Sequence, residues 1–135
     1  MILCDTSPLV ALVCADEPTH EACHSILADL TEPLLTTWVC FGEAMHLVGK
    51  GRLLYRQRLL WKFVERGTLF FHNHTDAEAL RMIALMVKYQ NVPMDLGDAS
   101  LVAAAETRNS PRIFSLDSDF HIYRLHDKLP FEVFP

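Results

Sequence analysis

Four acidic residues of this 135-residue chain lie in unusually apolar surroundings. Asp5 and Asp117 each follow a short apolar run, and Glu43 and Asp98 lie early in apolar segments of helical length. Burying carboxylates together is unfavourable because like charges repel and lose water, but a bound divalent cation makes the same arrangement favourable. Oxygen ligands suit Mg²⁺ or Mn²⁺. The pattern therefore favours a metal site that could activate a water, orient a phosphate and stabilise a leaving oxygen in phosphodiester hydrolysis.

Each acid also has a structural interpretation when it is taken singly. Asp5 could cap a following helix, and an acid at Asp95 or Asp98 favours a helix N-terminus through the helix dipole. Asp117 could be a turn residue. Glu43 is harder to explain in this way, because caps and turns do not account for an acid inside an apolar helix. Taken together, the acids favour a metal site over separate structural roles.

Short apolar strands that alternate with helices would position these acids. The expected strands are 2–4, 34–36, 68–72 and 112–115, with a short fifth at 131–134. The expected helices begin at Ser7-Pro8 and then cover 17–30, 38–48, 52–66, 75–89 and 96–108. Such alternation indicates a parallel sheet covered on both faces. Because ligands bind outside the carboxyl ends of parallel strands, acids that follow strands lie where a site is expected.

Four stretches resemble the successive motifs of PIN-domain proteins, the VapC-type toxins in particular. They are residues 2–12, 41–47, 95–106 and 113–120, and the first and third are the more specific. The match spans residues 2–120 in the right order, and the chain length suits one PIN domain. The resemblance implies an α/β fold, a three-layer α/β/α sandwich around a short, mainly parallel sheet of four to five strands. We accordingly expect residues 1–135 to form a single PIN-like nuclease domain.

The resemblance also implies a set of site residues. The family's acids fall on Asp5, Glu43, Asp98 and Asp117, and the hydroxyls that often assist them fall on Thr6 and Ser115. Three aspartates, Asp5, Asp98 and Asp117, would hold Mg²⁺ or Mn²⁺ directly or through water, while Glu43 would orient a water. Asp95 and Asp119 are extra or replacement ligands of lower rank, because they do not fill the expected motif positions.

The resemblance predicts a metal-dependent endoribonuclease that cleaves RNA as the toxin of a toxin–antitoxin pair. Two alternatives stay open, a PIN-type nuclease of RNA maturation and a non-catalytic metal-bound RNA-binding scaffold. A toxin implies a small antitoxin protein, often with paired toxin subunits, so we expect a homodimer or a toxin–antitoxin hetero-oligomer. The predicted clamp for that partner is the helical hairpin 38–66, whose apolar residues exceed what one face must bury and whose segment 50–66 carries a net charge of +5.

Composition and motif spacing also bear on nucleic-acid binding, on localisation and on the roles of the cysteines and histidines. A net charge of −5 argues against binding to nucleic acid through bulk positive charge. The sequence contains neither an apolar run long enough to span a membrane nor a signal-peptide pattern, so we expect a cytoplasmic protein. The four cysteines form no metal-binding spacing and are expected in the core. His72 and His74 flank Asn73 at a strand end, where a solvated turn is expected rather than a pair of ligands.

Overall fold

The computed structural model describes all residues, 1–135. Its main sheet contains β1 (Ile2–Cys4), β2 (Leu34–Thr37), β3 (Leu69–His72), β4 (Arg112–Phe114) and β7 (Glu132–Phe134). The strand order is β3-β2-β1-β4-β7, and all neighbouring strands are parallel. β1 is the central strand, with Leu3 opposite Leu35 on one side and Ile113 on the other. The predicted fold class is confirmed, including the short parallel sheet.

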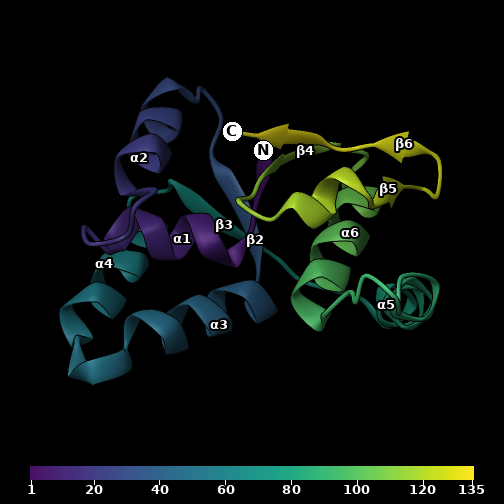
Figure 1. Cartoon of the computed structure of the whole chain (residues 1–135), viewed down its shortest axis with the longest axis horizontal. Coiled ribbons are helices and arrows are strands. Elements are labelled where there is room, and N and C mark those ends of the chain that lie inside the picture. The colour runs from purple at the N-terminus through teal and green to yellow at the C-terminus, as the bar shows by residue number, and fades with distance from the viewer.

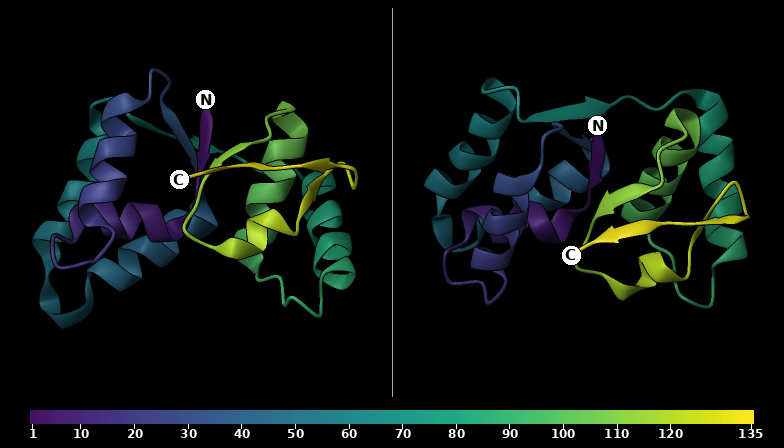
Figure 2. Two further views of the ribbon diagram at one scale, coloured as in Figure 1. Left: turned by 45° about the horizontal axis from the view of Figure 1, so that its top comes forward. Right: turned by 90° about the horizontal axis from the view of Figure 1, so that it is seen from above.

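Helices cover both faces of this sheet (Figures 1 and 2). They are α1 (Thr6–Val13), α2 (His20–Asp29), α3 (Trp38–Val48), α4 (Leu54–Glu65), α5 (Asp76–Lys88) and α6 (Leu96–Arg108), with short 3₁₀ helices at Lys50–Arg52 and Ser118–His121. α1 to α4 lie on one side, and α5 and α6 lie on the other (Figure 2). None of these helices combines the length and apolar character that a bilayer crossing would need.

Alternation along β1 divides the core into two parts. Ile2 and Cys4 belong to a cluster with the apolar residues of α1, α2, α3 and α4. Leu3 points to the opposite face and joins a cluster built on α5, α6 and the C-terminal segment. Because successive side chains of a strand face opposite ways, three residues are enough to hold both helical layers. All four cysteines are buried and free, as their apolar surroundings predict.

α3 and α6 begin where the sequence predicts, whereas α2 and α4 begin later than expected, at His20 and Leu54. Thr75 caps α5 by accepting a hydrogen bond from the backbone N–H of Glu78, as the capping-box spacing predicts. The first helix begins at Thr6 rather than at Ser7-Pro8, because Asp5 is its N-cap and accepts from the Thr6 N–H. A small antiparallel hairpin, β5 (Arg124–Leu125) and β6 (Leu129–Pro130), was not predicted. Each of its strands has two residues, which is too few to show a period.

Candidate metal centre

Three aspartates from distant parts of the sequence meet at the carboxyl edge of the sheet. Asp5 directly follows β1, Asp117 follows β4, and Asp98 lies in the first turn of α6. One carboxylate oxygen from each lies within 4.8 Å of the others. Asp5 and Asp98 are buried and Asp117 is half-buried. The two strands bring Asp5 and Asp117 together because β1 and β4 are parallel neighbours that end side by side.

Ser115 links two of these carboxylates. Its hydroxyl donates to Asp5 Oδ2 at 2.8 Å and accepts from the Asp117 N–H at 3.0 Å. The other Asp5 oxygen, Oδ1, accepts from the Thr6 N–H at 2.7 Å. Asp5 is therefore held at both oxygens, so its orientation is fixed before any ligand arrives.

Asp98 is oriented by a residue that the sequence interpretation missed. The hydroxyl of Tyr123 donates to Asp98 Oδ2 at 2.8 Å, and the Tyr123 side chain is fully buried. Asp95 caps α6 by accepting from the Asp98 N–H at 2.8 Å. Tyr123 lies 25 residues after Asp98, next to the short 3₁₀ helix, and no local spacing in the sequence points to this contact.

Burial and mutual repulsion raise the pKa values of the central acids. Burial is the main cause that raises the pKa of Asp5 to about 6, against hydrogen bonds from Ser115 and Thr6 that lower it. Burial also raises the pKa of Asp98 to about 7, and the nearby charges of Asp95, Asp5 and Asp117 add to the rise. Burial and the hydrogen bond to Asp98 raise the pKa of Tyr123, so its hydroxyl keeps its proton and remains a donor.

A cleft with a volume of about 290 Å³ opens over these aspartates. Its lining also includes Thr6, Glu43 and Asp95. Glu43 is exposed, which corrects the expectation that its apolar neighbours place it in a partly buried position. The neighbouring residues Phe41 and Ala44 turn into the core, and Glu43 lies on the opposite side of α3, facing the cleft. Its only side-chain hydrogen bond is a long one, 3.4 Å from the Thr6 hydroxyl.

The lower-ranked acids lie at the margin of the group. Asp95 is exposed and lines the cleft. Asp119 is half-buried, does not line the cleft, and its backbone N–H donates to Asp117 Oδ1 at 2.9 Å. Neither belongs to the group of three convergent carboxylates. The geometry thus brings Asp5, Asp98 and Asp117 together, places Glu43 and Asp95 beside them, and leaves Asp119 outside.

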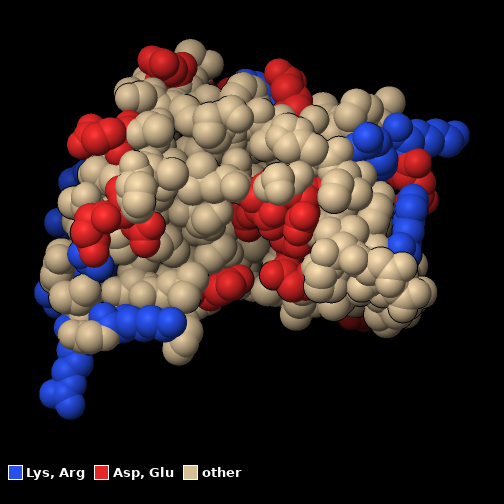
Figure 3. Space-filling model, viewed as in Figure 1, with Lys and Arg blue, Asp and Glu red and all other residues tan.

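No lysine or arginine forms an ion pair with any acid of the cleft. Figure 3 shows a group of acidic side chains in the middle of one face, whereas Lys and Arg lie at its margins. A convergent set of carboxylate oxygens without a cationic partner fits a hard divalent cation such as Mg²⁺ or Mn²⁺. Burial raises the pKa of the nearby Cys40 thiol to about 12, so it is not a nucleophile at neutral pH.

The fold is that of a PIN domain, and the family model of the PIN domain matches residues 2–125. The chain therefore belongs to the PIN-domain family. A comparison with curated protein sequences gave no significant match.

Solved structures of toxin–antitoxin proteins share the fold. One is VapC20 of Mycobacterium tuberculosis, described as a sarcin-ricin loop cleaving toxin, with a TM-score of 0.80, 16% identity, and coverage of 88% of this chain and 92% of that one. A toxin–antitoxin complex from Klebsiella pneumoniae has a TM-score of 0.66 at 20% identity, covering 89% and 90%. VapBC2 from Rickettsia felis, bound to a promoter DNA fragment, has a TM-score of 0.71 at 14% identity, with 100% coverage of both chains.

Proposed function

We propose that this PIN-domain protein is a divalent-metal-dependent endoribonuclease and the toxin of a toxin–antitoxin pair. The observation that carries the proposal is the convergence of Asp5, Asp98 and Asp117 at one edge of the sheet without a cationic side chain among them. Buried like charges of this kind destabilise the fold unless a bound cation compensates them. Structural likeness to the VapC toxins supports the choice of an RNA-cleaving toxin within the family.

The proposed roles follow from the contacts of each side chain. Asp5, Asp98 and Asp117 would hold Mg²⁺ or Mn²⁺, which when bound supplies Lewis-acid activation of a water and charge neutralisation at the scissile phosphate. Ser115 and Tyr123 fix Asp5 and Asp98 through hydrogen bonds of 2.8 Å each. Such outer contacts orient ligands and tune their affinity.

Glu43 is available to hydrogen-bond a water, because it is exposed at the cleft and has no ion-pair partner. We assign it the orientation of the attacking water. The Thr6 hydroxyl, which contacts both Glu43 and the carbonyl of Cys40, steadies that side chain. RNA lies in the cytoplasm, which is where a toxin of this kind would act.

A small antitoxin protein is the proposed inhibitor, and α4 offers it a surface. A groove of about 470 Å³ runs between α4 and the pair α1 and α2, and its lining includes Leu12, Leu59 and Phe63. Arg56, Lys62 and Arg66 also line it. Several apolar side chains of the hairpin 38–66 are exposed, namely Trp38, Leu47, Leu54, Tyr55, Leu59 and Trp61, whereas Leu60 is buried in the core. A groove lined by apolar and basic side chains suits an amphipathic, acidic segment of a partner.

Arg56 contributes less to this surface than its residue type suggests. Its guanidinium forms an ion pair with Asp16 at 2.8 Å, and its side chain is only 16% exposed. Lys62 has no such partner in the chain. Recognition of an acidic partner or of RNA phosphates would therefore depend on Lys62 and Arg66 more than on Arg56.

Cleavage assays test the proposal and separate it from its alternatives. Purified protein should cut RNA with Mg²⁺ or Mn²⁺ and stop cutting when EDTA removes the metal, whereas a non-catalytic scaffold would bind RNA without cutting it. Asp5→Asn keeps the size of the side chain and should abolish cleavage without loss of fold. Cleavage at the wild-type rate by Asp5→Asn would show that the site is wrong. A neighbouring reading frame for a small DNA-binding protein would favour a toxin over an RNA-maturation nuclease.

A further inference from the structure

A second group of metal-ligating side chains lies at the far side of the sheet, at the end of edge strand β3. His72 is the last residue of β3, His74 follows in the loop, and Glu78 lies in the first turn of α5. One ligand atom of each lies within 4.8 Å of the others. His72 is buried, with 4% of its surface exposed, so the expectation of a solvated turn is wrong for this residue. β2 separates this strand from β1 and the aspartates.

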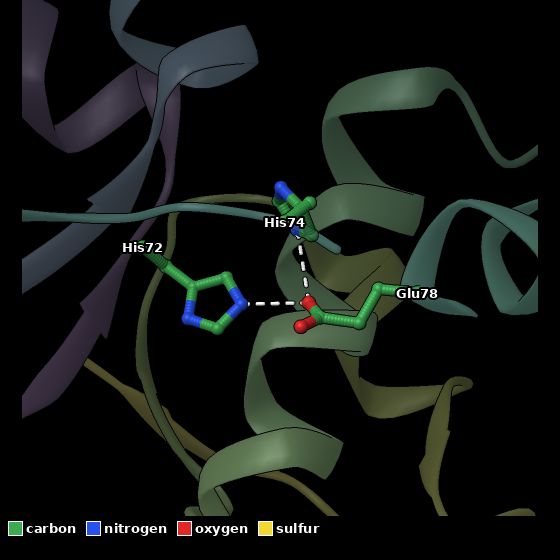
Figure 4. Close-up of side chains that lie close together, drawn as sticks. All are labelled: His72, His74 and Glu78. Carbon is green, nitrogen blue, oxygen red and sulfur yellow. Dashed lines mark hydrogen bonds and ion pairs between the residues drawn. The ribbon is translucent and has the colours of Figure 1, made fainter. Parts of the chain in front are cut away.

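The two histidine side chains point at the same carboxylate oxygen of Glu78 (Figure 4). His72 Nε2 lies 2.6 Å from Glu78 Oε2, and His74 Nε2 lies 3.8 Å from the same oxygen. Burial raises the pKa of Glu78, but the hydrogen bond from His72 and the charges of both histidines outweigh it, so the pKa of Glu78 is lowered. Glu78 is thus an anion at neutral pH, with two imidazole nitrogens directed at it.

This cluster offers nitrogen as well as oxygen ligands, so it should select a different metal from the all-oxygen aspartate centre. Two imidazole nitrogens and one carboxylate are a typical three-ligand set for Zn²⁺, which leaves a fourth position for water. Mg²⁺ prefers oxygen ligands in an octahedral arrangement, which this cluster does not offer. We propose that His72, His74 and Glu78 form a second metal site that takes Zn²⁺ or a similar transition-metal cation and rejects Mg²⁺.

Arg108 gives the proposed site a distinctive feature. Its Nε donates to His72 Nδ1 at 3.0 Å, so Nδ1 accepts and the ring proton lies on Nε2, between His72 and Glu78. A cation bound at Nε2 takes the place of that proton. The ring then carries its proton on Nδ1, and Arg108, whose Nε now faces a donor, must release the ring. Arg108 is an exposed residue at the end of α6, so its side chain can move into solvent.

The metal would join β3 and α5, with one ligand from the loop between them. His72 belongs to β3 and Glu78 to α5, while His74 Nε2 also lies 2.9 Å from the carbonyl of Ser100 in α6. His74 must exchange that contact for the cation. Because binding to the folded state alone stabilises it by mass action, saturating Zn²⁺ should raise the midpoint of thermal unfolding. This inference does not depend on the proposed nuclease activity.

Titration with Zn²⁺ and Co²⁺ in excess Mg²⁺ tests the site, because Mg²⁺ occupies the aspartate centre. We expect one transition-metal ion per chain and, with Co²⁺, the strong visible absorption of a four-coordinate ion with nitrogen ligands. His74→Ala should lower Zn²⁺ affinity by at least about a hundredfold, since losing a ligand should cost more than losing an outer-shell partner. Asp98→Asn is the matched control and should leave Zn²⁺ affinity unchanged.

Arg108→Gln supplies a second variant that does not depend on losing a ligand. It removes a positive charge and a competing donor, so Zn²⁺ affinity should rise, by roughly three- to tenfold for a partly solvated charge pair. Circular dichroism would confirm that each variant is folded. Absence of Zn²⁺ binding in excess Mg²⁺ would overturn the proposal. Binding that survives in His74→Ala and disappears in Asp98→Asn would overturn it too.

Discussion

Two regions of the molecule contain clustered acids, but only one of them pairs these acids with basic side chains. Near the β5–β6 hairpin, Glu106 accepts two hydrogen bonds from Arg81 at 2.8 and 3.0 Å. Asp127 in the hairpin turn accepts from Arg81 at 2.9 Å and from Lys88 at 2.8 Å. At the carboxyl edge of the sheet, Asp5 and Asp98 are buried together with no lysine or arginine.

The contrast shows which acids the fold uses for its own stability and which it leaves for a ligand. Hydrogen bonds from Lys88 and Arg81 lower the pKa of Asp127, so its charge is stabilised within the chain. Burial raises the pKa values of Asp5 and Asp98, so their charges are destabilised until something else compensates them. Carboxyl groups whose pKa values are raised in this way are typical of binding and catalytic sites.

Neutralising an acid of the cleft should have the largest effect on activity. Asp98→Asn removes a charge but can still accept a hydrogen bond from Tyr123, so the fold should persist. We expect RNA cleavage to fall by at least about a hundredfold, more than is usual for loss of an outer-shell partner. Glu106→Gln is the matched control and should cleave RNA at the wild-type rate. Equal losses in the two variants would remove the distinction between the regions.

The stability of the metal-free protein should fall as pH rises through the acids of the cleft. The pKa of Asp5 is raised from 3.8 to about 6 and that of Asp98 from 3.8 to about 7. Between about pH 4 and 7 the folded state therefore binds more protons than the unfolded state, so the free energy of unfolding decreases with increasing pH. The loss should be on the order of a few kcal/mol and should shrink in Asp98→Asn.

Denaturant titrations at pH 5 and pH 8 in EDTA measure this difference. Asp127 contributes with the opposite sign, because a lowered pKa gives stability that is lost only as pH falls below its ordinary range. A wild-type protein that is more stable at pH 8 than at pH 5 without metal would contradict the interpretation of the cleft.

Removing the ion pairs of Arg81 with Glu106 and Asp127 should lower the stability of the fold without changing the rate of RNA cleavage. Arg81→Met removes the shared partner of Glu106 and Asp127 while keeping much of its apolar stem. Because these groups are partly exposed, we expect a loss of about 1 kcal/mol in the free energy of unfolding. RNA cleavage should match the wild type when both proteins are measured well below their unfolding temperatures. A large loss of cleavage by folded Arg81→Met would show that the two regions are coupled.

The smallest effect should come from the acid at the margin of the cleft. Asp119→Asn leaves the backbone N–H that donates to Asp117 intact, so we expect cleavage to change by less than about threefold. Asp117→Asn, its close neighbour, should lose most of its activity. Similar losses in both variants would mean that the ligand set is wider than the three convergent aspartates.

The central part of the site was predictable because it depends on strand ends. Asp5 and Asp117 follow short apolar runs, and parallel strands bring their carboxyl ends to one edge. Asp98 was predictable from its place at the start of the most apolar helix. The main strands and helices could be predicted from the spacing of apolar residues and from the residues that break it, since Pro33 precedes β2 and Gly49 follows the end of α3.

What the sequence did not predict depends on contacts between distant segments. Tyr123 reaches Asp98 only because the chain after β4 folds back over α6. His72 is buried because Glu78 and Arg108 cover it, and both come from other elements. The exposure of Glu43 depends on how α3 is rotated against α1, which a largely apolar helix does not fix by its own pattern.

Binding of Mn²⁺ to the wild type and to Asp98→Asn tests the central claim most directly, because Mn²⁺ is measured by its own paramagnetic signal without any RNA. The wild type should bind Mn²⁺ at the aspartate centre, Asp98→Asn should lose that binding, and Glu106→Gln should retain it. Because the site proposed at His72, His74 and Glu78 does not take Mg²⁺, only Mn²⁺ that excess Mg²⁺ displaces is counted. Such binding with equal affinity in the wild type and Asp98→Asn, or none in the wild type, would contradict the account.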